Sequence, residues 1–228
     1  IKYAANAFLA MKITFINEVA DLCEAVGANV QQVAKGIGLD NRIGSKFLHA
    51  GPGYGGSCFP KDTLALVRTA EEAGAPIRLV ETTVSVNDAR KERMAQKIIA
   101  AAGGVVDGKT IAMLGLTFKP NTDDMREAPS LSIIPALQKA GAKIRAYDPA
   151  GLMEAEKLLS GVEFVTGPYR CAEGADVLAI ITEWNEFRAL DLDRVRSALA
   201  QPVIVDLRNV YDASDMAERG FTYVSVGR

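Results

Sequence analysis

The 228-residue sequence is poor in cysteine and histidine, lacks long apolar runs and has no excess of charge of either sign. Its three cysteines, Cys23, Cys58 and Cys171, are far apart. This spacing argues against a disulfide framework or a CxxC metal site, so we predict no metal and a reducing, cytoplasmic environment. No apolar run is long enough to cross a bilayer, and no signal peptide is recognisable.

The charge balance and the missing nucleotide motifs narrow the choice of partner. The formal net charge is −2, and lysine and arginine are spread along the chain, which argues against a nucleic-acid or membrane surface. We therefore expect a small-molecule partner. The sequence contains neither a GxGxxG fingerprint nor the GK[ST] of a Walker motif. It opens on IKYAANAF, inside a helical pattern, so we expect it to be part of a longer protein.

The first part of the chain has the periodicity of helices. Apolar residues at three- and four-residue steps predict a long amphipathic helix from Ile1 to about Val26. Further helices are predicted over 28–40 and 60–74, with a loop over 42–58 between them, and a long helix over about 77–102 has no internal breaker. Residues 1–106 are thus predicted to be an all-helical domain.

The pattern changes after the glycines between 103 and 108. Buried-strand runs at 110–116, 143–148, 176–182, 202–207 and 221–226 alternate with short helices at 129–142, 152–160 and 191–200. Such alternation is typical of an open parallel sheet covered on both faces. The predicted fold class is α/β: a helical domain, then a small doubly wound, Rossmann-like domain over 107–228.

The stretch GPGYGGSCFPKD places Cys58 at the end of a glycine-rich turn. Glycines let a backbone approach a ligand closely, and Pro60 is suited to the first position of the following helix. A helix N-terminus and Lys61 both favour a thiolate, which is a nucleophile. Asp62 either complements the helix dipole or orients a water or a base. Cys23 and Cys171, on apolar helical faces, are predicted to be packing residues.

Other polar residues leave alternatives open. His49 lies on the same loop as Cys58, so a Cys/His hydrolase is conceivable, although no oxyanion motif accompanies the pair. Lys2 and Asn6 are four residues apart and share a helix face, which is either a solvated stripe or a pair of donors for a developing oxyanion. Periodicity does not choose between these interpretations.

Candidate nucleotide contacts follow two of the predicted strands. Phe118, Lys119 and Arg126 lie in GLTFKPNTDDMREAPS after the first strand, and Arg208 lies in VDLRNVYD after a later one. Ligands of open α/β sheets bind at the carboxyl ends of strands, so these residues could hold an anionic nucleotide. Either arginine could equally be an ordinary surface residue.

Four segments together resemble the UDP-glucose 6-dehydrogenase family of nucleotide-sugar dehydrogenases: KYAANAFLAMKITFINEVADLCEAVGA, RIGSKFLHAGPGYGGSCFPKD, GLTFKPNTDDMREAPS and YDP. The likeness covers essentially the whole chain, in the order of the family's central helical domain and C-terminal UDP-binding domain. The family's N-terminal NAD-binding domain has no counterpart in these residues. The resemblance therefore implies NAD as cofactor, and also that this chain is inactive by itself.

The resemblance also implies a chemistry and a set of roles. In that family, NAD oxidises the C6 alcohol of a nucleotide sugar twice, to a carboxylate, and Cys58 would form a thiohemiacetal and then a thioester. Lys2, Asn6 and Asp62 match positions that support the oxygen charge, the hydrolytic water and proton movement. Matches to substrate-binding positions are Arg42, Phe47, His49, Tyr54, Gly55, Phe59, Phe118, Lys119 and Arg208. Arg126 matches a cofactor-contacting arginine, and Lys61 is assigned to the same cofactor.

The resemblance also implies expectations about Arg42, His49 and the assembly of the protein. Arg42 matches an arginine that reaches the substrate of a neighbouring subunit, and the central helices match a dimer interface, so a homodimer is predicted. His49 stands where some members have a substrate-contacting lysine, which puts that contact in question. The alternatives are a dehydrogenase for UDP-N-acetylmannosamine or GDP-mannose, or a nucleotide-binding module without redox chemistry.

Overall fold

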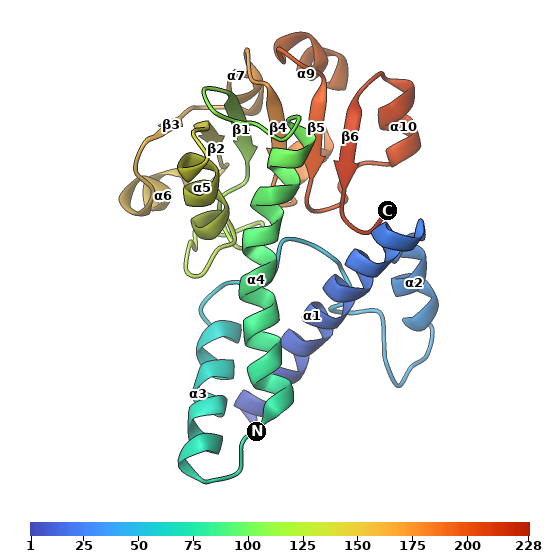
Figure 1. Cartoon of the computed structure of the whole chain (residues 1–228), viewed down its shortest axis with the longest axis vertical. Coiled ribbons are helices and arrows are strands. Elements are labelled where there is room, and N and C mark those ends of the chain that lie inside the picture. The colour runs from blue at the N-terminus through green and yellow to red at the C-terminus, as the bar shows by residue number, and fades with distance from the viewer. The chain divides into compact units, whose positions relative to one another are not determined.

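The computed structural model describes residues 1–228, which divide into two compact units (Figure 1). The first comprises Ile1–Arg90 with Val226–Arg228, and the second comprises Lys91–Ser225. This division lies inside a helix, before the boundary predicted at 106/107. The assignment of 1–106 and 107–228 as separate domains stays a prediction. No helix in the structure is both long and apolar enough to cross a membrane.

The first unit is built from helices at the predicted places. They are α1 (Lys2–Val26), α2 (Val30–Ile37), α3 (Phe59–Glu72) and the first part of α4 (Arg78–Ala101). Gly27 ends α1 in the left-handed region with φ 72°, and the Asn29 side chain caps α2 by accepting from the Gln31 amide. Helix α3 begins at Phe59. Pro60, which the sequence predicts to be the first residue of this helix, is therefore its second.

Helix α1 packs against both α2 and α3. Its buried residues include Ala7, Ala10, Ile16 and Ala20, so small side chains make up much of its packed surface. The polar residue Asn17 is also buried on α1.

The second unit contains a six-stranded sheet in which all pairs are parallel, with strand order β3-β2-β1-β4-β5-β6. The strands are β1 (Thr110–Leu114), β2 (Lys143–Tyr147), β3 (Val162–Phe164), β4 (Val177–Ile180), β5 (Val203–Asp206) and β6 (Thr222–Ser225). Five of them lie where the sequence predicts strands. The predicted α/β fold class with a doubly wound parallel sheet is therefore confirmed.

Helices cover both faces of this sheet. The chain proceeds outward from β1 in opposite directions in its two halves, and right-handed crossovers then place the two sets of helices on opposite faces. One set is α5 (Ser130–Lys139) and α6 (Leu152–Leu158). The other is α7 (Pro168–Ala172), α9 (Leu192–Ala198) and α10 (Ala213–Glu218), with the single-turn helix α8 (Asn185–Arg188) beside them. Buried residues from this second set, including Cys171, Phe187 and Met216, pack against Leu114 and Leu178 of the strands.

Four short elements escape the sequence analysis. They are β3, α7, α8 and α10, which are three, five, four and six residues long. The three helices have fewer than two turns each, so they show no helical period, and β3 is shorter than every strand that the sequence predicts.

Candidate functional site

Cys58 occupies the N-cap position of α3, and its thiol is exposed. The Sγ atom lies 3.7 Å from Ser57 Oγ and makes no capping hydrogen bond. The thiol is therefore accessible to a ligand while the helix N-terminus, whose dipole favours an anion, lies directly beneath it. Cys23 and Cys171 are buried, as predicted, and burial raises the pKa of Cys171 to about 12.

One turn further along α3, the fully buried side chain of Asp62 gathers three of the predicted site residues. Its Oδ2 accepts a hydrogen bond from Asn6 Nδ2 at 2.6 Å and lies 3.7 Å from Lys2 Nζ. Its Oδ1 accepts from Lys61 Nζ at 2.5 Å. Lys2 and Asn6, which are four residues apart on α1, thus both face Asp62, and the interpretation as a solvated stripe is wrong for Asn6. Lys2 keeps a 68% exposed side chain.

The charges in this group stabilise one another. The hydrogen bond from Lys61 is the main reason why the pKa of Asp62 lies below its ordinary value, and Asn6 and Lys2 lower it further, against the opposing effect of burial. The same bond raises the pKa of Lys61, to which Cys58 adds a smaller effect. At neutral pH, Asp62 is therefore a carboxylate and Lys61 an ammonium ion.

Three predicted substrate positions form an aromatic cluster beside Cys58. The ring of Phe59 lies 6.0 Å from that of Phe47 and 6.0 Å from that of Tyr54, the latter edge to face. Tyr54 is buried, and this burial raises its pKa to about 12, which keeps the phenol protonated. Gly55 follows Tyr54 in the chain and is also buried.

Two predicted residues of the first unit stand apart from this group. Arg42 is exposed and forms an ion pair with Asp40 at 2.6 Å, and the bond to Arg42 lowers the pKa of Asp40. His49 is exposed and makes no hydrogen bond to Cys58. The structure therefore offers no Cys/His pair of the kind a hydrolase would use.

The loop 51–56, which leads to Cys58, is buried although it has no regular structure. The Gly51 amide donates to Asn17 Oδ1 at 2.8 Å, and the Gly51 carbonyl accepts from Arg90 Nε at 2.6 Å. The Tyr54 amide donates to Asn87 Oδ1 at 2.8 Å, and Asn87 Nδ2 donates to the Tyr54 carbonyl at 3.2 Å. Asn17, Asn87 and Arg90 are themselves buried.

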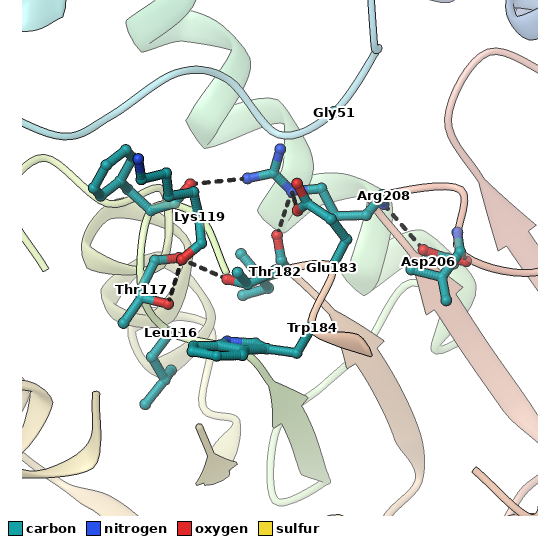
Figure 2. A network of polar contacts seen from close by, with 12 residues as sticks. Gly51, Leu116, Thr117, Lys119, Thr182, Glu183, Trp184, Asp206 and Arg208 are labelled. Atoms are coloured by element: carbon teal, nitrogen blue, oxygen red, sulfur yellow. Dashed lines mark hydrogen bonds and ion pairs between the residues drawn. The ribbon is translucent and has the colours of Figure 1, made fainter. Parts of the chain in front are cut away.

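In the second unit, the strand order reverses between β1 and β4, and the loops that follow these strands meet at the carboxyl edge. Arg208, which follows β5, reaches both of them (Figure 2). Its Nε donates to the Ile181 carbonyl at 2.6 Å, and its Nη2 donates to the Phe118 carbonyl at 3.3 Å. Its guanidinium also lies 3.1 Å from Glu183 Oε2. The structure thus brings Arg208, Phe118 and Lys119 to one edge, with Lys119 Nζ 5.3 Å from the Phe118 ring centre.

Two buried carboxylates hold the loops of this edge. Asp148, after β2, accepts hydrogen bonds from the amides of Leu116, Thr117, Ala150 and Gly151, and from the Thr117 hydroxyl and Trp184 Nε1. Asp206 accepts from the amides of Arg208, Val210 and Tyr211 and from the Tyr223 hydroxyl. Burial nevertheless raises the pKa of Asp206, because none of these donors carries a charge.

Gly115 allows the loops after β1 and β4 to approach at this point. Its φ is +87°, and a Cβ placed there would lie 2.5 Å from Thr182 Cβ. Thr182 Oγ1 in turn donates to the Thr117 carbonyl at 2.6 Å. Only glycine satisfies both the backbone angle and the contact.

Known proteins match both units. The central domain of the UDP-glucose/GDP-mannose dehydrogenase family matches residues 1–89, and the UDP binding domain of the same family matches residues 112–213. The chain belongs to the UDP-glucose/GDP-mannose dehydrogenase family. The resemblance inferred from the motifs is thereby confirmed.

Relatives within this family share high identity with the chain. A UDP-glucose 6-dehydrogenase of Rhizobium meliloti (strain 1021) is 66% identical over 228 residues, which are the whole of this chain and 52% of the relative. The UDP-glucose 6-dehydrogenase TuaD of Bacillus subtilis (strain 168) is 50% identical over the whole chain and 50% of its own length. The chain therefore spans about half the length of the curated relatives it matches.

Solved structures of the family have the same fold. A UDP-glucose dehydrogenase from Pyrobaculum islandicum has a TM-score of 0.87 and 36% identity over 99% of this chain and 50% of that one. An NDP-N-acetyl-D-galactosaminuronic acid dehydrogenase from Methanosarcina mazei Go1 has a TM-score of 0.89 and 30% identity over 100% of this chain and 50% of that one.

The two predicted cofactor contacts are cationic and lie in different units. Lys61 binds Asp62, as described above. Arg126 forms two bonds with Asp124, from Nε at 2.9 Å and from Nη2 at 2.7 Å, and this pairing lowers the pKa of Asp124. Both side chains are more than half exposed, so their charges face solvent.

Several polar residues of the two sites were missed by the sequence analysis. They are Asn17, Asn87, Arg90, Asp148, Thr182, Glu183 and Asp206. A signal for three of them was present, because Asn17, Asn87 and Arg90 occupy inward-facing positions of amphipathic helices where an apolar residue is expected. A polar residue on an apolar face must find a buried partner.

We predict that Asp62→Asn lowers the midpoint of thermal unfolding at neutral pH. Because the pKa of Asp62 is lowered in the folded chain, its ion pairs contribute stability above the ordinary carboxyl value of 3.8, and this contribution is lost as the pH falls further. Unfolding followed by circular dichroism should therefore show a gap between variant and wild type that is constant down to about pH 4 and narrows below it.

Glu71→Gln is a suitable control, because it removes the same charge from an exposed position on α3. We expect no such gap for this control. A gap for Asp62→Asn that keeps its size through the acid range would contradict the assignment of its stability to the carboxylate.

Proposed function

We propose that the chain is the thiol-bearing and UDP-binding part of an NAD-dependent UDP-glucose 6-dehydrogenase, which oxidises UDP-glucose to UDP-glucuronate. The observation that carries this proposal is the exposed Cys58 thiol at the start of α3, followed within one turn by a buried Asp62 that meets Lys2, Asn6 and Lys61. Identities of 66% and 50% to proteins named UDP-glucose 6-dehydrogenase support the choice of sugar.

Cys58 is proposed as the nucleophile toward the C6 aldehyde of the substrate. A bond forms between Sγ and C6, and the electron pair of the carbonyl moves to its oxygen, which then takes a proton to give a thiohemiacetal. Loss of a hydride from C6, together with the proton of the hydroxyl group, gives a thioester. Water attacks the thioester carbon and loses a proton, the bond between C6 and Sγ breaks with the Cys58 thiolate as the leaving group, and the carboxylate product is released. The thiolate then takes up a proton. The covalent bond divides a difficult oxidation into smaller steps.

The neighbours of Cys58 are proposed to manage charge during these steps. Lys2 and Asn6 donate toward the oxygen that becomes negative, since an ammonium and an amide are the donors that stabilise an oxyanion. Asp62, which its neighbours keep ionised, accepts the proton that the attacking water loses. Phe47, Tyr54, Gly55 and Phe59 are proposed to contact the substrate.

Arg208, Phe118 and Lys119 are proposed to bind the UDP moiety. Arginine and lysine suit a diphosphate, and the Phe118 ring provides an apolar surface for the uracil base. Arg42 and His49 stay candidate substrate contacts, Arg42 for the substrate of a second subunit. Lys61 and Arg126 are exposed cations of the kind that the pyrophosphate of NAD requires. When bound, NAD accepts the hydride in both oxidations.

A homodimer through the central helices is the proposed assembly. Among the large apolar side chains of α4, only Leu79 is exposed, so this helix offers little apolar surface to a second chain. Helix α1 is a better candidate, because Phe8, Phe15 and Leu22 are exposed by 58%, 53% and 61% at seven-residue intervals. This spacing gives an apolar stripe of the kind that pairs helices.

We predict that Cys58→Ala in the full-length protein lowers the rate of UDP-glucuronate formation by at least roughly 100-fold, since the covalent route is lost. Cys23→Ala is the matched control, and we expect it to keep the activity because Cys23 is a buried packing residue. NADH absorbance and chromatography of the sugar products measure both. An active Cys58→Ala variant would remove Cys58 from the mechanism. An N-acetylated uronate as the preferred product would replace the proposed sugar by that of the Methanosarcina relative.

Arg208→Ala should weaken binding of both UDP and UDP-glucose to this chain by at least about tenfold, because a charge-assisted contact to phosphate is removed. Isothermal titration calorimetry measures the two dissociation constants. Arg219→Ala, which removes an arginine that follows α10 and pairs with Asp215, should bind like wild type. Equal affinities for wild type and Arg208→Ala would place the nucleotide elsewhere.

Light scattering at micromolar concentration should give twice the mass of one chain. Phe15→Glu should shift this mass toward the monomer, because a carboxylate is costly to bury in an apolar interface. Leu158→Glu places the same charge at a comparably exposed apolar position on α6 and should leave the dimer intact. A monomeric wild-type chain would refute the proposed dimer.

A further inference from the structure

We infer that Asn17, Asn87 and Arg90 are positioning residues, which fix the loop 51–56 and through it the substrate surface beside Cys58. This inference rests on the proposed function. Neither the aromatic cluster nor the Asp62 group contains these three residues. They act on the loop backbone from two helices, α1 and α4.

The contacts are made to the backbone at two points of the loop. Gly51 is held on both sides, its amide by Asn17 and its carbonyl by Arg90. Tyr54 is held in the same way by Asn87 alone, whose amide group donates to one backbone group and accepts from the other. Such pairing fixes the position of the backbone whatever side chains the loop carries.

Arg90 also joins the two helices to each other. Its Nη1 donates to the Asn17 carbonyl at 3.1 Å and lies 2.8 Å from Asp21 Oδ1. The side chain is only 1% exposed, and its charge is paired with Asp21. Arg90 therefore ties Gly51 to α1 in a buried environment, where hydrogen bonds hold geometry most strictly.

The held loop leads directly into proposed substrate positions. Tyr54 and Gly55 belong to it, and Cys58, the N-cap of α3, lies two residues after Gly56. Gly53 and Gly56 have positive φ, so the loop has few restraints of its own and depends on external contacts. Because reacting atoms must meet within a few tenths of an ångström, loss of these contacts should displace the substrate relative to the thiol.

The direct test is amide hydrogen exchange, followed by mass spectrometry, on the 228-residue chain. Asn87→Leu keeps a similar volume and removes both bonds to Tyr54. We expect amides of 51–56 to exchange at least tenfold faster than in wild type, while those of α1 and α3 keep their rates. Unchanged exchange in the loop would overturn the inference, and so would equal acceleration throughout residues 1–90.

Two further variants make the result specific. Thr83→Val is the matched control, since Thr83 is buried one turn earlier on α4 and bonds only to the Leu79 carbonyl of its own helix. It should exchange like wild type. Asn87→Asp keeps the acceptor for the Tyr54 amide but loses the donor to its carbonyl, so we expect an intermediate rate. It also serves if Asn87→Leu does not fold.

A second measurement connects the loop to the site. Iodoacetamide alkylates the exposed Cys58, and UDP-glucose should slow this reaction. In Asn87→Leu, we expect at least a tenfold higher concentration of UDP-glucose to be needed for the same protection. A twofold or smaller change would overturn the positioning role. If UDP-glucose fails to protect the wild-type chain, the proposed function is refuted, and the exchange rates alone decide whether Asn87 holds the loop.

Discussion

A buried backbone outside helices and strands must find hydrogen-bond partners, and both candidate sites depend on this constraint. In the first unit, side chains of α1 and α4 supply the partners for the glycine-rich loop. In the second unit, Asp148 and Asp206 supply them for the loops at the carboxyl edge of the sheet. Each site thus contains an irregular segment whose backbone is hydrogen-bonded to buried polar side chains.

The three buried carboxylates show how the environment assigns different properties to the same group. Asp62 is surrounded by two lysines and an amide, and these lower its pKa. Asp206 meets only uncharged donors, and its burial raises its pKa. Asp148 accepts six hydrogen bonds from five residues and joins the loops that follow three strands. Because of these surroundings, Asp62 carries a negative charge near the thiol, whereas Asp148 and Asp206 hold the loops at the edge of the sheet.

The sequence predicts well those elements that carry a clear local signal. In the long helices apolar positions recur at the helical period, and five of the six strands appear as continuous apolar runs. β3, with three residues, and α8, with four, owe their structure to neighbours already in place. The structure of such short elements depends on tertiary contacts, and these contacts cannot be inferred from the local pattern of residues.

The features of the candidate sites also fall into two groups, those that a local pattern predicts and those that depend on contacts between distant residues. The α/β class, the thiol at a helix start and the strand ends near Phe118 and Arg208 can be predicted from the sequence, because periodicity, glycine and proline act locally. Three other features become visible only in the folded chain: Asn6 meets Asp62, fifty-six residues away, Arg208 reaches the Phe118 carbonyl, and Asn17, Asn87 and Arg90 hold one loop. Hydrogen bonds between distant segments are fixed by packing, which no local pattern of residues records.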